Sequence, residues 1–316
     1  MHGLVYKSTG SWYQVKSDDG REYACRIKGK FRIQGIKSTN PVAVGDRVVF
    51  STEVIGDEEV GVITAIEPRQ NYLVRRSVNL SKQLHVIAAN IDQIFLVITL
   101  KNPLTYTAFI DRFLVSAAAY HIEVVLVFNK WDTYEEDEVM KAEELLDVYA
   151  SIGYQTLKTS TKSRRLGCEE LKALMKEKTS IFAGNSGVGK SSLINAVEPN
   201  LDLKTSSTSE QHQQGQHTTT FAQMFDISFG GRIIDTPGIR GFGLATLERH
   251  EIADYFKEFF ALKSDCKFHN CLHDNEPNCA VKQALERGDI AQSRYDSYIG
   301  LLTDPEGPYR TDNYGQ

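Results

Sequence analysis

The sequence lacks any apolar run long enough to cross a membrane. The longest lies near residues 94–100, far short of the roughly 20 residues that a transmembrane helix needs. The first residues also lack a basic flank followed by an apolar core, so we expect no signal peptide. These absences predict a cytoplasmic protein without a membrane partner.

Cysteine and net positive charge are scarce as well. There are 5 cysteines in 316 residues, and three of them cluster late. An odd number in this arrangement argues against a disulfide framework and favours a reducing compartment and a metal site. The formal net charge of -5 excludes a protein that coats nucleic acid over its whole surface. Residues 1–76 nevertheless carry 12 Lys and Arg against 9 Asp and Glu, a mildly basic module on an acidic body.

Residues 1–70 contain about five short apolar segments separated by turn signals, with a hairpin turn at Asp18-Asp19-Gly20. This spacing predicts a small barrel of the oligonucleotide-binding (OB) type. The expected strands cover residues 3–7, 12–16, 23–27, 48–50 and 61–66. Residues 68–92 are expected to form a linker into the next domain.

Basic and apolar side chains alternate between residues 24 and 33. On a strand, this pattern places a basic stripe above an apolar face. The basic side chains are Arg26, Lys28, Lys30 and Arg32. Because Tyr6, Trp12, Tyr13 and Tyr23 lie nearby, the pattern suggests binding of single-stranded or structured RNA. A solvated edge strand protected by lysines is the alternative.

The most informative stretch spans residues 181–192, where an apolar run leads into Gly-x-x-x-x-Gly-Lys-Ser and then an amphipathic segment. Strand, loop and helix in this order predict a phosphate-binding loop whose backbone N–H groups surround an anion at a helix N-terminus. Lys190 can reach the terminal phosphates, and the Ser191 hydroxyl can bind magnesium. The predicted phosphate-binding residues are Gly184, Asn185, Ser186, Gly187, Val188, Gly189, Lys190, Ser191 and Ser192.

A second motif, Asn129-Lys130-Trp131-Asp132, follows an apolar strand expected over residues 124–128. The Asp132 carboxylate can accept hydrogen bonds from N1–H and the 2-amino group of guanine, which adenine does not offer. The Lys130 stem can lie along the base, and Asn129 can tie the motif to neighbouring loops. A later loop containing Ser160 and Thr161 is expected to support the base. Together with the phosphate-binding loop, these residues predict a GTP site.

Residues 204–220 are polar and cannot build a core, which is typical of a loop that the γ-phosphate and magnesium order in nucleotide switches. Thr219 is the expected magnesium ligand there. The later Asp235-Thr236-Pro237-Gly238 predicts that Asp235 holds magnesium through water and that the Gly238 N–H meets the γ-phosphate. Ile239 follows, where Ras-like enzymes carry a water-orienting glutamine, so His217 becomes the candidate for placing the water.

The order of these motifs is permuted, because Ras-like GTPases place the phosphate-binding loop first and the guanine motif late. A permuted GTPase flanked by a small β module and a late Cys/His cluster resembles the family of ribosome small-subunit-dependent GTPases A (RsgA). The resemblance implies a factor that binds the small ribosomal subunit and its rRNA, hydrolyses GTP to GDP faster on that subunit, and then leaves. It also points to His217 as the residue that places the water.

The late cluster reads Cys-x4-Cys-x-His-x5-Cys. Three thiolates and one imidazole make a closed tetrahedral zinc set, which predicts a structural site. The predicted ligands are Cys266, Cys271, His273 and Cys279. His269 is a competing nitrogen ligand, but the family pattern matches His273. Zinc would pin a loop between an aromatic helix and a helix over residues 281–287.

The sequence therefore predicts an α/β protein: a circularly permuted P-loop GTPase domain, an N-terminal OB-type barrel and a C-terminal zinc-binding helical domain. The expected domains are residues 1–72, 73–245 and 246–316, and we expect a monomer. Lys190, Thr219 and His217 are the predicted catalytic residues, with zinc and magnesium as cofactors. One alternative is an RNA-binding module gated by GTP, with incidental hydrolysis; another is a permuted GTPase acting on the large ribosomal subunit.

Overall fold

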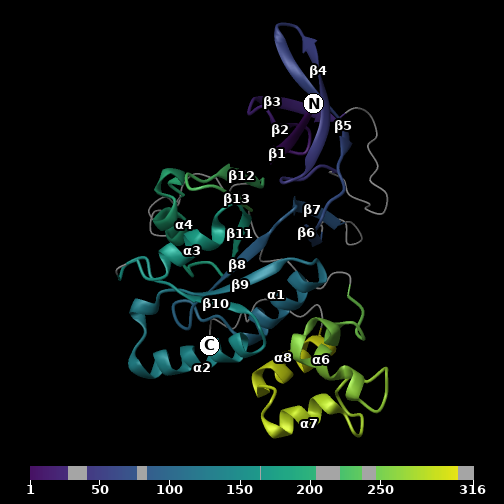
Figure 1. Cartoon of the computed structure of the whole chain (residues 1–316), viewed down its shortest axis with the longest axis vertical. Helices are drawn as coiled ribbons and strands as arrows, with labels where there is room; N and C mark the ends of the chain where they lie inside the picture. Colours follow the sequence, from purple (N-terminus) through teal and green to yellow (C-terminus); the bar gives the residue numbers. More distant parts are fainter. Residues whose placement is uncertain (28–40, 77–83, 164, 204–220, 237–246, 305–316) are drawn as a thin grey trace, which may run out of the picture.

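The computed structural model describes residues 1–27, 41–76, 84–163, 165–203, 221–236 and 247–304. An N-terminal barrel, a central α/β domain and a C-terminal helical module follow one another along the molecule (Figure 1). Among the described residues, no helix is both long and apolar enough to cross a bilayer.

Among its described residues the barrel has five strands, and all five expected strands are present. They are β1 His2–Ser8, β2 Tyr13–Ser17, β3 Glu22–Ile27, β4 Arg47–Ile55 and β5 Glu58–Ile66. The strand order is β1-β2-β3-β5-β4, and β4 pairs back with β1. Alternate side chains point inward, so Tyr23 and Cys25 of β3 are buried while Ala24 and Arg26 are exposed. The predicted apolar and basic faces of β3 are thus confirmed up to Ile27; Lys28, Lys30 and Arg32 lie outside the described residues.

The expected linker over residues 68–92 is wrong, because it contains a hairpin of β6 Tyr72–Arg76 and β7 Leu84–Ala89. Its charged residues suggested a linker, but its apolar residues become buried once the strands pair. A register shift between Leu73 and Val74 allows both to be buried, at 0% and 2% exposure. The barrel packs on this hairpin through Val44, which bridges to Ala88.

In the described part of the central domain, the strands of the sheet follow the order β10-β9-β8-β11-β13-β12. Every neighbouring pair is parallel except β12 with β13. The strands are β8 Gln93–Ile98, β9 Glu123–Phe128, β10 Gln155–Lys158, β11 Thr179–Ala183, β12 Gln223–Asp226 and β13 Arg232–Asp235. All residues of β8 and β11 are buried, as expected for central strands with both faces covered.

Two pairs of helices cover the two faces of this sheet. The helices α1 Thr107–Ala119 and α2 Glu136–Ser151 pack on the face that carries Ile94, Leu96 and Ile98. The helices α3 Cys168–Met175 and α4 Lys190–Val197 pack on the opposite face, which carries Phe95 and Val97. The alternation along β8 therefore divides the core into two layers.

The permuted order becomes visible in the sheet. The strands β8, β9 and β10 come first in the chain, and β11 then enters beside β8 in the middle of the sheet. The carboxyl ends of β9, β10, β11 and β13 therefore lie at one edge of the sheet, where ligands bind in α/β proteins. On the far side, β12 pairs with β1 at Gln223 and Lys7, which joins the sheet to the barrel.

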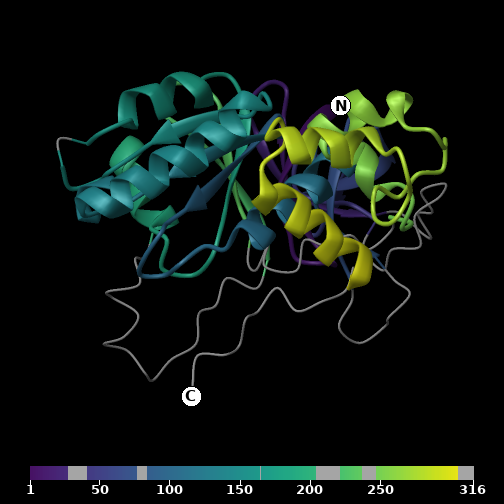
Figure 2. The same ribbon diagram turned by 90° about the horizontal axis from the view of Figure 1, so that it is seen from below.

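The C-terminal module contains α6 Lys257–Leu262, α7 Ala280–Arg287 and α8 Gln292–Thr303. The expected aromatic helix before the cysteine cluster is broken into a 3-10 turn, Ile252–Tyr255, and α6. The break lies at Phe256, whose extended backbone (φ -93°, ψ 108°) interrupts the helix while its side chain enters the core. Helix α8 lies against α1 of the central domain (Figure 2), and Val115 of α1 belongs to the core of the module.

Candidate functional site

The loop between β11 and α4 has the backbone of a phosphate-binding loop. Gly184, Gly187 and Gly189 have φ values of +133°, +82° and +100°, which L side chains rarely adopt. At Gly184 a Cβ atom would lie 2.4 Å from the carbonyl oxygen of Val97. Only glycine therefore lets this loop turn so closely over β8, and α4 begins directly after it at Lys190.

The charges around this loop suit a phosphate and a magnesium ion. The Lys190 ammonium donates to the carbonyl oxygens of Gly184 (3.0 Å) and Asn185 (2.7 Å). Asp235 lies at the end of β13; burial raises the pKa of its carboxyl, and the charge of Lys190 opposes that rise. Ser191 is half-buried on the first turn of α4. Hydroxyl and carboxylate oxygens are the ligands that magnesium prefers, so the donors present fit this ion.

Asn129 joins the guanine motif to the phosphate-binding loop. Its side chain is 2% exposed, and Nδ2 donates to the carbonyl oxygen of Val188 at 2.8 Å. A Cβ atom at Gly189 would lie 2.4 Å from the same Nδ2, so glycine is needed for this approach. On the other side, Thr159 Oγ1 donates to Asn129 Oδ1 at 3.0 Å. The buried side-chain amide of Asn129 thus connects the guanine motif to the phosphate-binding loop, which lies 59 residues later in the chain.

Lys130 and Asp132 follow on a tight turn. Lys130 has φ +61° and its Nζ donates to the carbonyl oxygen of Asn102 at 2.5 Å. Burial lowers the pKa of Lys130, and so does the charge of Lys162. Asp132 lies on the 3-10 turn Trp131–Thr133 and is exposed, so its carboxylate is accessible to a ligand.

The loop after β10 supports Asp132. Ser160 is fully buried, and its Oγ donates to Asp132 Oδ1 while accepting from the N–H groups of Lys162 (3.2 Å) and Ser163 (3.0 Å). Thr161 is half-buried in the same loop. The Lys158 ammonium lies over the Trp131 ring, 4.9 Å from its centroid. These contacts hold the turn that carries Asp132 against the sheet edge.

Some predicted site residues lie outside the described residues, namely His217, Thr219 and Gly238. Of the basic stripe, only Arg26 is described; it is exposed and pairs with Glu53 at 3.3 Å. Thr159 begins the loop that was expected to support the base, but it was not among the predicted site residues, because its role depends on its contact with Asn129.

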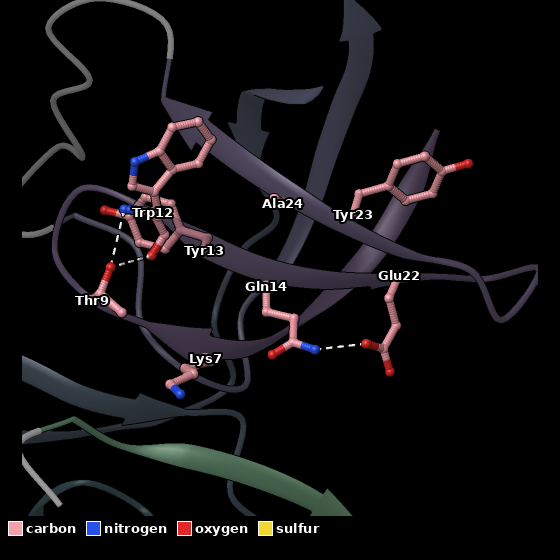
Figure 3. A pocket seen from close by; sticks show the side chains of 8 residues that line it. All are labelled: Lys7, Thr9, Trp12, Tyr13, Gln14, Glu22, Tyr23 and Ala24. Atoms are coloured by element: carbon pink, nitrogen blue, oxygen red, sulfur yellow. Dashed lines mark hydrogen bonds between the residues drawn. The ribbon is translucent and has the colours of Figure 1, made fainter. Parts of the chain in front are cut away.

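A groove of about 440 Å³ opens on the barrel between β1, β2 and β3 (Figure 3). Trp12, from the loop before β2, is 47% exposed at this groove, and Gln14 donates to Glu22 at 2.6 Å across it. Its lining residues are Lys7, Thr9, Trp12, Tyr13, Gln14, Glu22, Tyr23 and Ala24.

Cys266, Cys271, His273 and Cys279 bring their donor atoms within 4.8 Å of one another. Cys266 Sγ lies 3.6 Å from His273 Nδ1 and 4.0 Å from Cys279 Sγ, and His273 Nδ1 lies 3.3 Å from Cys279 Sγ. Sulfur ligands about 2.3 Å from a tetrahedral metal are separated by roughly 3.8 Å. The spacing and the donor types therefore fit a metal ion held by all four residues.

Helix α8 holds the loop that carries the Cys/His cluster. The hydroxyls of Tyr295 and Tyr298 donate to the carbonyl oxygens of His273 (2.8 Å) and Leu272 (2.6 Å). His273 is 1% exposed, and burial lowers the pKa of its imidazole, which favours the neutral form that binds metals. The competing His269 is exposed and is not part of the cluster.

Comparison with known proteins agrees with this geometry along the whole chain. The family model for the RsgA GTPase matches residues 66–245, and that for the RsgA N-terminal domain matches residues 2–63. The chain is 60% identical over 314 residues to the small ribosomal subunit biogenesis GTPase RsgA of Christiangramia forsetii, covering 99% of each chain. It is 58% identical over 316 residues to the protein of the same name from Flavobacterium johnsoniae, covering 100% of this chain and 97% of that relative.

Solved structures give the same result. The crystal structure of YjeQ from Thermotoga maritima superposes with a TM-score of 0.77 at 38% identity, covering 97% of this chain and 98% of that one. The structure of YloQ, described as a circularly permuted GTPase, gives a TM-score of 0.73 at 30% identity, covering 100% of this chain and 96% of that one. The resemblance noted in the sequence is confirmed: the chain belongs to the RsgA family of circularly permuted GTPases.

Proposed function

We propose that this GTPase acts in a late step of small ribosomal subunit maturation, where it binds the subunit and its rRNA, hydrolyses GTP to GDP and phosphate, and dissociates. The main support for the nucleotide site is a hydrogen bond of the Asn129 side chain, in which Nδ2 donates to the carbonyl oxygen of Val188 at 2.8 Å. This contact holds the base-reading turn beside the phosphate-binding loop. The names of the relatives, small ribosomal subunit biogenesis GTPases, support the subunit as the partner.

In this proposal, guanine lies between the two loops. The Asp132 carboxylate accepts from N1–H and the 2-amino group, and the Lys130 stem lies along the base. Trp131 and the loop of Ser160 and Thr161 complete the base pocket. The phosphates lie against the backbone of the loop between β11 and α4 and against Lys190. The phosphate-binding residues are Gly184, Asn185, Ser186, Gly187, Val188, Gly189, Lys190, Ser191, Ser192 and Gly238.

The hydrolysis step is the attack of water on the γ-phosphate. Ser191, Thr219 and, through water, Asp235 hold magnesium, which neutralises phosphate charge when it is bound. Lys190 stabilises the charge that develops on the oxygens of the γ-phosphate. His217 places the attacking water, because Ile239 offers no polar group for that purpose.

The flanking domains bind the ribosomal partner and a structural ion. We assign zinc to Cys266, Cys271, His273 and Cys279, because a closed set of sulfur and nitrogen donors suits this metal and leaves no position for a reactant. The barrel contacts rRNA through Arg26, Lys28, Lys30 and Arg32, and the exposed Trp12 offers a face for base stacking. We propose the cytoplasm as its location, a monomer as its state and boundaries near residues 72 and 245.

The direct test is GTP hydrolysis by the purified protein alone, with small subunits and with large subunits, using ATP as the control nucleotide. We expect turnover of GTP that small subunits stimulate and large subunits do not. Stimulation by large subunits alone would contradict the assigned partner. Subunit binding that depends on GTP without multiple turnovers would instead identify an RNA-binding module gated by the nucleotide.

The role of His217 has its own test. We expect His217→Ala to bind GTP as tightly as the parent protein but to lower subunit-stimulated turnover at least about 100-fold, because the water loses its positioning group. Nucleotide affinity and single-turnover rates measure the two effects separately. Unchanged turnover on the small subunit would remove His217 from the mechanism.

A further inference from the structure

The loop that follows β8, residues 99–105, closes on itself. Thr99 Oγ1 donates to the carbonyl oxygen of Pro103 at 2.5 Å. The Thr105 N–H donates to the carbonyl oxygen of Thr99 at 2.8 Å, and the Thr99 N–H donates to Thr105 Oγ1 at 3.2 Å. Since Thr99 and Thr105 are buried, this loop is a fixed support at the same sheet edge as the nucleotide site.

This loop touches both halves of the site. The carbonyl oxygen of Asn102 accepts from Lys130 in the guanine motif. The ring of Pro103 lies beside Gly187 of the phosphate-binding loop, with Cδ 3.5 Å from where a Cβ atom at Gly187 would lie. The ammonium of Lys101 also pairs with Glu138 near the start of α2.

Tyr134 connects the same loop to the turn that carries Asp132. Its hydroxyl donates to the carbonyl oxygen of Asn129 at 2.9 Å and accepts from the Leu100 N–H at 2.9 Å. Its ring meets Trp131 edge-on, with centroids 5.7 Å apart. Burial raises the pKa of this hydroxyl, so the donated proton stays in place at neutral pH.

Tyr134 lies directly after the turn that carries Asp132, so its hydroxyl contact spans that turn. Tyr134 ends the 3-10 turn Trp131–Thr133, and its N–H contacts the carbonyl oxygen of Trp131. Its hydroxyl reaches back to Asn129, the residue that precedes Lys130. The Tyr134 hydroxyl therefore links the two ends of this turn, residues 129 and 134, to each other and to the N–H of Leu100.

We propose that Tyr134 is a positioning residue for guanine recognition, which holds the turn of Asp132 so that the carboxylate can meet both N1–H and the 2-amino group of the base. The inference rests on the proposed GTP site. Tyr134 acts through Asn129 and Asp132 and touches no nucleotide itself. A second hydrogen bond from the 2-amino group needs tighter placement of the carboxylate than a single bond from N1–H does.

The test compares GDP with IDP, because hypoxanthine keeps N1–H and lacks the 2-amino group. Tyr134→Phe leaves the Asn129 carbonyl and the Leu100 N–H without this partner. We expect the Kd for GDP to rise about tenfold and that for IDP about two- to threefold, so that the preference for GDP falls about three- to fivefold.

Tyr106→Phe is the matched control, since Tyr106 lies just beyond the same loop and is 45% exposed; we expect parental affinities for both nucleotides. An equal loss of affinity for GDP and IDP in Tyr134→Phe would show a merely structural role and overturn the proposal, as would no loss at all. The affinity of the parent protein for ADP tests the proposed GTP site separately from the role of Tyr134. If the parent does not prefer GDP to ADP, the proposed GTP site itself fails.

Discussion

The central domain is joined to its two neighbours in different ways. Toward the barrel, Asp226 of β12 accepts from Lys16 and Tyr6, both at 2.6 Å, while Arg232 lies 3.4 Å from the same carboxylate. Lys16 and Asp226 remain 34% and 46% exposed. Toward the C-terminal module, Arg294 of α8 pairs with Asp111 of α1 at 2.6 Å, and these side chains are 2% and 0% exposed.

The difference in burial changes what each contact contributes. Exposed ion pairs contribute about 0–1 kcal/mol, because water already solvates both charges. A buried pair contributes little net stability, but removing one partner is costly because the other charge stays buried. Arg294 also binds Glu258 of α6, and Tyr149 of α2 donates to Asp111 at 2.7 Å. The C-terminal module is therefore anchored to the central domain by buried charges, whereas the charged contact of the barrel with β12 is partly exposed.

The largest expected effect comes from removing the zinc ion that we propose for the C-terminal module. Cys279→Ser should abolish zinc binding and unfold this module, because zinc contributes roughly 10–16 kcal/mol to comparable small folds. Metal content and protease resistance of residues 247–304 measure the outcome. His269→Ala is the control and should keep both. A protease-resistant module without metal would show that contacts with α1 suffice to fold it.

Breaking the buried junction should have the next largest effect. Arg294→Met keeps much of the side-chain volume but leaves Asp111 and Glu258 without their cation. We expect the free energy of unfolding to fall by about 3–5 kcal/mol, measured by denaturant titration. Arg287→Met removes an exposed pair with Asp289 and should cost less than about 1 kcal/mol. Equal effects of the two substitutions would remove the contrast between the junctions.

The smallest effect is expected at the barrel junction. Asp226→Asn should lower stability by no more than about 1 kcal/mol. Burial alone would raise the pKa of Asp226, but hydrogen bonds from Lys16 and Tyr6 lower it below the ordinary 3.8 on balance. A carboxyl with a lowered pKa stabilises the folded state above its unfolded pKa and loses this contribution as the pH falls through its folded pKa.

The difference in stability between Asp226→Asn and the parent should therefore be constant at neutral pH and vanish only below about pH 4. Urea titrations across this range measure it. If the difference in stability disappeared near pH 6, a group other than the Asp226 carboxyl would be responsible for the pH dependence.

The sequence predicted elements whose signals are local. The Gly-x-x-x-x-Gly-Lys-Ser loop, the guanine motif, the cysteine cluster and the strands of the barrel each depend on residues close together in the chain. The β6–β7 hairpin was missed because its apolar residues are buried only after pairing across residues 77–83, and helix α8 was not predicted. The contacts of Arg294 with Asp111 and of Tyr134 with Leu100 join residues 183 and 34 positions apart, which no local pattern could reveal.

The measurement that tests the central claim most directly is the nucleotide preference of Asp132→Asn. We propose that two loops from permuted parts of the chain surround one guanine nucleotide and that Asp132 contacts the base. The parent protein should bind GDP far more tightly than XDP or ADP. Asparagine offers an N–H group to the 2-oxo group of xanthine, so Asp132→Asn should bind XDP more tightly than GDP. Weaker binding of every nucleotide without a shift toward XDP would contradict the assigned base contact.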